Sequence, residues 1–266
     1  MYDLFNREIN YLRISVTDRC NLACTYCMPS EHIGRPGRAE MLSIQEIAEV
    51  VQTLAPLGIS KIRLTGGEPL LRAGIEELVG MINEVEGIKE LAMTTNGQGL
   101  AGMAQVLARN GLKRVNISLD TLDPVRYREI TRGGEMRKVM KGIDASLEAG
   151  LIPVKINSVL TPDSDPVEME ALQEFCDTKG LELRFIRQMD LQSGKFWRVE
   201  GGQGGHCNFC NRMRLTVDGR FIPCLFSEKE YSIIDYGIVG AFEKAILNKP
   251  RKGMANTRST FYRIGG

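Results

Sequence analysis

The chain has 266 residues, enough for one large domain, or a domain with an appendage, around a buried core. Its 34 basic and 33 acidic residues leave a net charge of +1, which argues against binding to nucleic acid or a membrane through bulk charge. No segment approaches the roughly 18 uninterrupted apolar residues of a membrane helix, and the amino terminus lacks the apolar core of a signal peptide. We therefore expect a cytoplasmic protein.

Residues 10–190 alternate strand-like and helix-like segments. Six short segments rich in β-branched residues predict strands, and amphipathic segments lie between them. The predicted strands are 11–16, 61–66, 90–95, 114–119, 153–160 and 182–189. Strands that alternate with helices favour right-handed crossovers and a parallel sheet. Six such units fit an incomplete (β/α) barrel or a doubly wound sheet, and periodicity alone does not distinguish the two.

Two of the predicted helices have clear signals at their ends. Ser43 and Glu46 form a capping box ahead of an apolar stripe. Asp165 is the expected N-cap of the second helix, Pro166 its first residue, and Gly180 its stop signal. These signals predict where each helix begins and where the second one ends.

The alternating rhythm stops after residue 190. Two strand-like segments there flank Asp218-Gly219, which is typical of a hairpin turn, and a helix follows. These three segments are 212–217, 220–225 and 238–248. We predict two domains, a barrel over residues 1–190 and a smaller carboxyl-terminal domain over residues 191–266.

Three cysteines lie within eight residues, as Cys20, Cys24 and Cys27. Each thiolate can ligate one iron, so a C-x3-C-x2-C loop can hold three corners of a cubane [4Fe–4S] cluster and leave the fourth iron open. Structural zinc favours C-x2-4-C pairs and four ligands, and three cysteines cannot pair among themselves as disulfides. The loop therefore favours a catalytic iron–sulfur cluster.

A Thr-Gly-Gly-Glu-Pro sequence ends the second predicted strand, where Gly67 and Glu68 stand at its centre. Glycines allow a backbone to approach a ligand closely, and a carboxylate can receive an ammonium group. Together with the cysteine loop, this sequence resembles the radical S-adenosylmethionine (SAM) superfamily. The resemblance implies that SAM chelates the open iron and that the reduced cluster cleaves it to a 5′-deoxyadenosyl radical.

A second cysteine group consists of Cys207, Cys210 and Cys224. Taken alone it fits zinc, with His206 as a fourth ligand, as well as it fits an iron–sulfur cluster. In context, the sequence from Cys207 to Phe226 resembles the second cluster motif of the GTP 3′,8-cyclase family, which acts in molybdenum cofactor biosynthesis. That resemblance implies a second [4Fe–4S] cluster whose open iron contacts the guanine of GTP.

The resemblance extends through nearly the whole chain and implies roles for further residues. The positions that match SAM contacts are Tyr26, Gly67, Glu68, Thr94, Ser118 and Met189. Those that match contacts to the GTP phosphates are Arg13, Lys61, Arg63, Lys155 and Arg184. Catalytic positions are matched by Arg212, Arg214 and the terminal Gly265 and Gly266. Independently of the resemblance, charges on barrel strands are costly to bury unless paired, and a triphosphate would pair several of them.

The segment between the sixth strand and the second cysteine group is shorter here than is usual in that family, and Arg187-Gln188 replaces a sequence that usually contains glutamate. We predict an α/β fold, an incomplete (β/α)6 TIM-type barrel with a small carboxyl-terminal iron–sulfur extension. The leading hypothesis is a radical SAM lyase that converts GTP to 3′,8-cyclo-7,8-dihydro-GTP, with flavodoxin or ferredoxin as reductant and a homodimer as its assembly. The alternatives are a radical SAM enzyme for another nucleotide or a peptide, and a non-enzymatic metal-binding protein.

Overall fold

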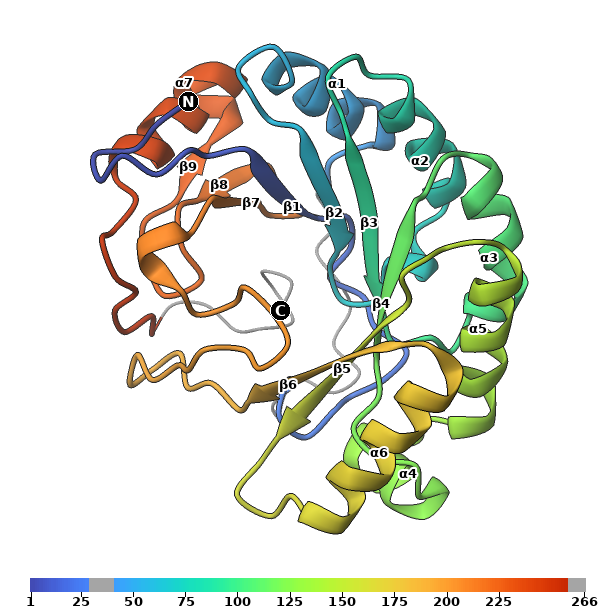
Figure 1. Cartoon of the computed structure of the whole chain (residues 1–266). Coiled ribbons are helices and arrows are strands. Elements are labelled where there is room, and N and C mark those ends of the chain that lie inside the picture. Colours follow the sequence, from blue (N-terminus) through green and yellow to red (C-terminus); the bar gives the residue numbers. More distant parts are fainter. Residues whose placement is uncertain (29–40, 258–266) are drawn as a thin grey trace.

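The computed structural model describes residues 1–28 and 41–257. In this part of the chain one sheet has the strand order β6-β5-β4-β3-β2-β1-β7-β8-β9 (Figure 1). Strands β6 to β1 and β7 run parallel, whereas β8 and β9 add antiparallel. The strands are β1 (Tyr11–Ser15), β2 (Lys61–Thr65), β3 (Glu90–Thr95), β4 (Arg114–Ser118), β5 (Lys155–Leu160), β6 (Glu182–Arg187), β7 (Arg212–Leu215), β8 (Arg220–Ile222) and β9 (Tyr231–Ser232).

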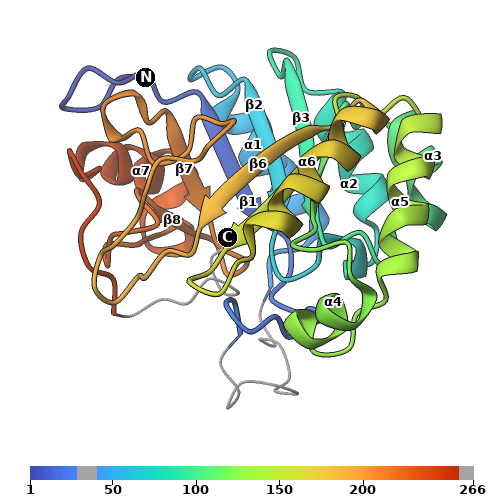
Figure 2. The same ribbon diagram turned by 60° about the horizontal axis from the view of Figure 1, so that its bottom comes forward.

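The helices cover the convex side of this curved sheet and leave its concave side facing inward (Figure 1). Helix α7 lies at the other end of the molecule from α3 and α5 (Figure 2). The helices are α1 (Ile44–Leu54), α2 (Ile75–Asn83), α3 (Leu100–Arg109), α4 (Pro124–Thr131), α5 (Met136–Glu148), α6 (Pro166–Lys179) and α7 (Ile233–Leu247), with short 3-10 turns η2 (Pro69–Leu71) and η3 (Cys207–Phe209). None of the helices in the described ranges is long and apolar enough to cross a bilayer.

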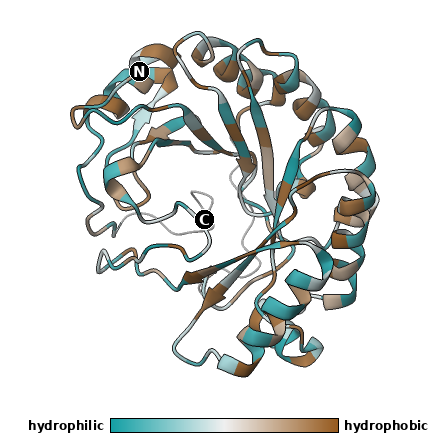
Figure 3. Ribbon diagram, in the orientation of Figure 1, coloured by the Kyte–Doolittle hydropathy of each residue, from teal (hydrophilic) through white to brown (hydrophobic). Residues whose placement is uncertain are grey.

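Hydrophilic and hydrophobic residues alternate along strands such as β1 (YLRIS) and β2 (KIRLT), and successive side chains of a strand point to opposite faces of the sheet (Figure 3). In β1, Leu12 and Ile14 are fully buried in the hydrophobic core, while Tyr11 and Arg13 line a cavity. In β2, Ile62 and Leu64 join the same core. The core therefore lies between the sheet and its helices, and the concave face is free to carry polar groups.

The predicted incomplete barrel is confirmed. Strands β1 to β7 are parallel to one another. The edge strands β6 and β9 are not paired with each other, so the described sheet does not close into a full barrel. Both predicted helix starts are also confirmed, because the Ser43–Glu46 capping box is complete and the Asp165 side chain accepts from Val167 N. Gly180 ends α6 in the left-handed conformation, with φ of 66°.

The hairpin is confirmed as β7 and β8, joined through Gly219 with φ of 75°. Two features beyond it were not predicted. Strand β9 has only two residues, and α7 begins five residues before the expected start at 238. Gly237, with φ of 66°, interrupts the helical conformation and divides the apolar pattern there. The division into domains at residue 190 stays a prediction, although β7 continues the sheet beside β1.

Candidate active site

The cysteine loop leaves the carboxyl end of β1 and is held by the backbone after β2. Gly67 N donates to Thr17 O at 2.7 Å, and Glu68 N donates to Arg19 O at 2.8 Å. A Cβ atom on Gly67 would stand 2.2 Å from Arg19 O. This glycine is therefore required by the close approach of two backbones, and it sets the position at which the cysteine loop begins.

Glu68 is 1% exposed and connects the loops after β2 and β3. Its carboxylate accepts from Thr95 Oγ1 at 2.7 Å, from Asn96 N at 2.7 Å and from Leu70 N at 3.1 Å. Burial raises the pKa of this carboxyl to about 7, against the lowering effect of these hydrogen bonds. Its role as a SAM contact stays a prediction, and what the structure describes is a carboxylate bound by protein donors.

The three thiols of the loop face one cavity. Burial raises the pKa of Cys20, Cys24 and Cys27, and the charges of neighbouring cysteines raise the pKa of Cys24 and Cys27 further. The amide group of Asn96 lies 3.9 Å from Cys20 Sγ and also donates to Asn21 Oδ1. Thiols that line one cavity can each ligate one iron of a cluster, which takes them as thiolates.

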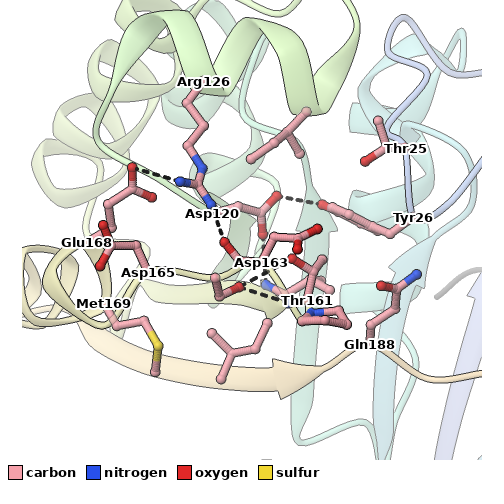
Figure 4. A pocket seen from close by; sticks show the side chains of 15 residues that line it. Thr25, Tyr26, Asp120, Arg126, Thr161, Asp163, Asp165, Glu168, Met169 and Gln188 are labelled. Carbon is pink, nitrogen blue, oxygen red and sulfur yellow. Dashed lines mark hydrogen bonds and ion pairs between the residues drawn. The ribbon is translucent and has the colours of Figure 1, made fainter.

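Tyr26 fixes the middle of the cysteine loop to the sheet (Figure 4). Its hydroxyl donates to Asp120 Oδ2 at 2.7 Å, and the other oxygen of Asp120 accepts from Val159 N at 2.7 Å. Tyr26 and Val159 line both the main cavity and a side cavity of about 360 Å³, whereas Asp120 lines the side cavity alone. The side cavity is also lined by Arg126, which pairs with Glu168 at 3.3 Å. The sequence placed Tyr26 at the site but not its partner Asp120.

The main cavity has a volume of about 700 Å³ and occupies the concave side of the sheet. Of the described side chains that line it, nine are basic and one is a carboxylate, that of Glu90. The basic residues are Arg13, Lys61, Arg63, Arg114, Arg184, Arg187, Arg212, Arg214 and Lys249. Such an excess of positive charge in a concave site attracts and holds a multiply charged anion.

Strand register brings three of these arginines side by side. Arg13 is the register partner of Arg63 on one side and of Arg214 on the other. Burial lowers the pKa of all three, and for Arg214 the value falls to about 10. These like charges are held together away from water. A bound polyanion would offset the free-energy cost of their desolvation and reduce the repulsion between them.

Tyr11 lies among these cations. The Arg63 and Arg212 guanidinium carbons stand 5.7 Å and 5.9 Å from its ring centre. Burial alone would raise the pKa of its hydroxyl, but surrounding arginines, led by Arg63, hold it below its usual value. Tyr11 is a residue of the site that the sequence did not single out.

Several buried polar atoms of the cavity wall have no hydrogen-bond partner in the described part of the chain. They are Thr94 Oγ1, Asn116 Nδ2, Asn157 Oδ1, Arg63 Nε and Arg184 Nε. A buried polar group without a partner costs about 1–3 kcal/mol. The wall therefore has donors and acceptors in place for a polar ligand.

Three predicted phosphate contacts, Lys61, Lys155 and Arg184, have carboxylate partners in the protein, and that of Arg184 is Glu182 at 4.0 Å. Lys155 pairs with Glu182 and does not line the cavity, whereas Lys61 lines it and stands 3.9 Å from Glu90. Glu90 also pairs with Arg114, an inward-facing arginine absent from the predicted set. Arg114 lies two residues before Asn116 and four before Ser118 on β4, so all three side chains share one face of the strand. That spacing was the signal in the sequence for an inward-facing Arg114.

The second cysteine group lies at the other end of the same cavity. Cys207 and Cys210 precede β7 and therefore stand at its amino end. The first cysteine loop leaves the carboxyl end of β1, and β1 and β7 are parallel, so the two groups lie at opposite ends of this strand pair. Arg7 Nη1 donates to Cys207 O at 2.7 Å. Lys249 Nζ donates to the carbonyl oxygens of Arg212, which follows Cys210, and of Pro223, which precedes Cys224. Across residues 1–28 and 41–257, no three His, Cys, Asp or Glu side chains stand close enough together to hold one metal ion.

The short segment before the second cysteine group forms part of the cavity wall. Phe196 and Trp197 line the cavity, followed by Val199 and the glycine-rich turn at 201–205. An isolated bridge between Phe185 and Glu200 holds the segment against β6, and a second bridge, between Asp190 and Lys195, closes a turn within the segment. Arg187 and Gln188 line the cavity as well, and Arg187 stands 3.6 Å from Glu200.

Most of the predicted site residues that the structure describes line the main cavity. The exceptions are Glu68 and Lys155, and the predicted Gly265 and Gly266 lie outside the described residues. Residues that line it without having been predicted include Tyr11, Arg114, Asn116, Asn157 and Lys249. Both cysteine groups and the basic set thus share one cavity, while the contacts assigned to individual residues stay predictions.

Comparison with known proteins agrees with this geometry. The family model described as "Radical SAM superfamily" matches residues 14–176. The GTP 3′,8-cyclase of Alkaliphilus oremlandii is 40% identical over 95% of this chain and 94% of its own length. That of Pelotomaculum thermopropionicum is 39% identical over 88% of this chain and 86% of its own. The alignment with that of Peptoclostridium acidaminophilum, 36% identical, runs over 319 positions and takes in all of this chain and 98% of the other, so that relative carries residues that this chain lacks.

Solved structures show the same fold at low identity. SuiB of Streptococcus suis bound to S-adenosylmethionine has a TM-score of 0.69 and 16% identity, over 86% of this chain and 64% of its own. Methylornithine synthase has a TM-score of 0.59 and 17% identity, over 95% of this chain and 76% of its own. Radical SAM proteins bind a [4Fe–4S] cluster and SAM, and the three thiols of the first loop fit that cluster. With relatives up to 40% identical over most of its length, the chain belongs to the GTP 3′,8-cyclase family of radical SAM enzymes.

Proposed function

We propose that this protein is a GTP 3′,8-cyclase that acts in molybdenum cofactor biosynthesis. The observation that carries the proposal is the single cavity with a three-thiol group at each end and nine basic side chains along its wall. A nucleoside triphosphate has negative charge to balance these cations and polar groups to pair with the unpartnered donors and acceptors of the wall. The names and high coverage of the relatives support the same substrate.

In this proposal Cys20, Cys24 and Cys27 hold the cluster that, with SAM, supplies the 5′-deoxyadenosyl radical. The chemistry supplied there would be the transfer of hydrogen from C3′ of the ribose to 5′-deoxyadenosine and the formation of a bond between C3′ and C8 of guanine. One electron is needed to cleave SAM, and a second electron with a proton completes the cyclised nucleotide. We propose a small reductant protein such as flavodoxin or ferredoxin as the electron donor, in a cytoplasmic homodimer.

The protein's own residues bind and orient the nucleotide. Arg63, Arg13 and Arg214 lie side by side on the adjacent strands β2, β1 and β7 and would bind the triphosphate. The unpartnered carboxamide atoms are a donor, Asn116 Nδ2, and an acceptor, Asn157 Oδ1. This pair matches ribose hydroxyls, which both donate and accept, better than it matches phosphate oxygens, which only accept. Fixing the ribose and the base in one geometry is a large part of what an enzyme contributes to such a reaction.

The second cysteine group is proposed to hold a second [4Fe–4S] cluster at the base-binding end. Cys207, Cys210 and Cys224 line the cavity but do not form a compact site for one ion with the other described residues. A cubane takes one iron per thiolate, so its ligand sulfurs need not meet at a point. Zinc is the alternative that metal analysis tests.

Substitution of Cys210 by Ser separates the two ends of the site. We expect the iron content of anaerobically reconstituted protein to fall from about eight to about four per chain. Cleavage of SAM to 5′-deoxyadenosine should continue, because the first thiol group is intact, while the GTP-derived product is lost. Iron, zinc and sulfide analysis, with chromatography of both products, measures this. Zinc in place of iron in the parent protein, with no loss of iron in the variant, contradicts the second cluster.

A second candidate keeps the radical chemistry and replaces GTP by another nucleotide. It is favoured by the short segment around Trp197, which lines the cavity, and by the greater length of the Peptoclostridium acidaminophilum relative. Calorimetric titration of the reconstituted protein with GTP, ATP, CTP and UTP distinguishes the candidates. Binding of another triphosphate in preference to GTP would favour the second.

A further inference from the structure

Lys249 follows α7 and is 3% exposed, which is unusual for a lysine. None of the ion pairs within residues 1–28 and 41–257 includes it. A buried ammonium group is costly unless an opposite charge is near. Its burial therefore points to an anion at this place in the assembled protein.

The hydrogen bonds of Lys249 place its charge beside the second cysteine group. Its Nζ donates to Arg212 O and to Pro223 O, each at 2.6 Å. Arg212 is two residues after Cys210, and Pro223 directly precedes Cys224. An ammonium group has three N–H donors, so these two bonds orient it between the two cysteine-bearing segments and leave one donor unused.

The two cysteine groups lie in opposite electrostatic surroundings. Carboxylates lie beside the first group: Tyr26, between Cys24 and Cys27, donates to Asp120, and the backbone of Asn96, whose side chain lies 3.9 Å from Cys20 Sγ, donates to Glu68. Cations lie beside the second group. Arg7 Nη1 donates to Cys207 O, and Lys249 Nζ donates to the carbonyl oxygens of Arg212 and Pro223.

We propose that Lys249 is the permanent countercharge of the second cluster and that it raises the reduction potential of that cluster. The inference rests on the proposed cluster at Cys207, Cys210 and Cys224. Three thiolates make the assembled cluster an anion, and one added electron makes it more negative. A fixed positive charge stabilises the reduced state more than the oxidised state, and net charge is one of the factors that set such potentials.

The test uses the full chain with Cys20, Cys24 and Cys27 replaced by Ser, so that the second cluster gives the signal. The parent, Lys249→Gln, Lys249→Arg and Lys229→Gln are reconstituted anaerobically. Each is titrated with a low-potential chemical reductant, and the cluster is followed by electron paramagnetic resonance. Lys229 is an exposed control whose Nζ donates to Asn248 at 2.8 Å near the same helix end.

We expect a more negative midpoint potential for Lys249→Gln, and values close to the parent for Lys249→Arg and Lys229→Gln. Loss of the cluster in Lys249→Gln with retention in Lys249→Arg also supports the countercharge. An unchanged potential in Lys249→Gln, or loss or an equal shift in both Lys249 variants, overturns it in favour of a purely structural link. A parent that contains no cluster overturns the proposed second cluster as well, and iron and sulfide analysis of the parent identifies that case.

Discussion

Replacement of Gly67 by Ala is expected to destabilise the protein by about 3 kcal/mol and to remove the first cluster. The new Cβ would stand 2.2 Å from the carbonyl oxygen of Arg19 and 2.6 Å from its carbonyl carbon. Both are backbone atoms of the cysteine loop, so no side chain can rotate to relieve the contact. Chemical denaturation gives the free energy of unfolding, and iron analysis after reconstitution gives the cluster content.

The matched control is Gly102→Ala in α3. A Cβ on Gly102 meets no atom within 4 Å, and the residue is exposed within the helix. We expect this variant to gain about 0.5–1 kcal/mol, because alanine favours the helix, and to keep its full iron content. Equal stability of the two variants would contradict the claim that the glycine after β2 is required by the cysteine loop.

Replacement of Arg63 by Met is expected to weaken GTP binding by roughly 10–100-fold, which is about 1.4–2.8 kcal/mol. Arg63 is 7% exposed, its Nε has no partner in the described part of the chain, and its register partner is Arg13. Methionine has a similar length and removes a buried charge that is surrounded by like charges. The free energy of unfolding without ligand should therefore stay the same or rise while the affinity falls.

Arg126→Met is the control for charge. Arg126 lines the side cavity and pairs with Glu168, so its loss should leave GTP affinity almost unchanged (Figure 4). Calorimetric titration of reconstituted protein with GTP measures both variants. If Arg63→Met binds GTP as tightly as the parent, the basic wall is not the triphosphate site.

The sequence predicted the barrel strands within one or two residues, because they are short segments that alternate regularly with amphipathic helices. It also identified the two cysteine groups, because cysteines at such short spacing are typical of a metal or cluster site. It could not show that Glu68 does not line the cavity, since its three hydrogen-bond donors come from the last residue of β3, the residue after it, and η2. Partners of that kind depend on the packing of the loops.

Residues such as Tyr11 and Lys249 escaped the prediction for related reasons. Tyr11 lies two residues before Arg13 on β1, but its neighbours Arg63 and Arg212 come from β2 and β7, and local patterns do not encode that pairing of strands. Lys249 follows a helix in a basic tail, where an exposed lysine is the usual expectation. Its burial follows from the packing of the chain after α7 beside the second cysteine group.

The most direct test of the proposed function is the product of anaerobic turnover with GTP, SAM and a reductant. Cyclisation moves one hydrogen to 5′-deoxyadenosine and adds one back, so the product has the mass of GTP and must be separated from it by chromatography. We predict a GTP-dependent isomer of GTP that forms together with 5′-deoxyadenosine. Formation of 5′-deoxyadenosine with no such isomer would contradict the assignment of GTP as the substrate.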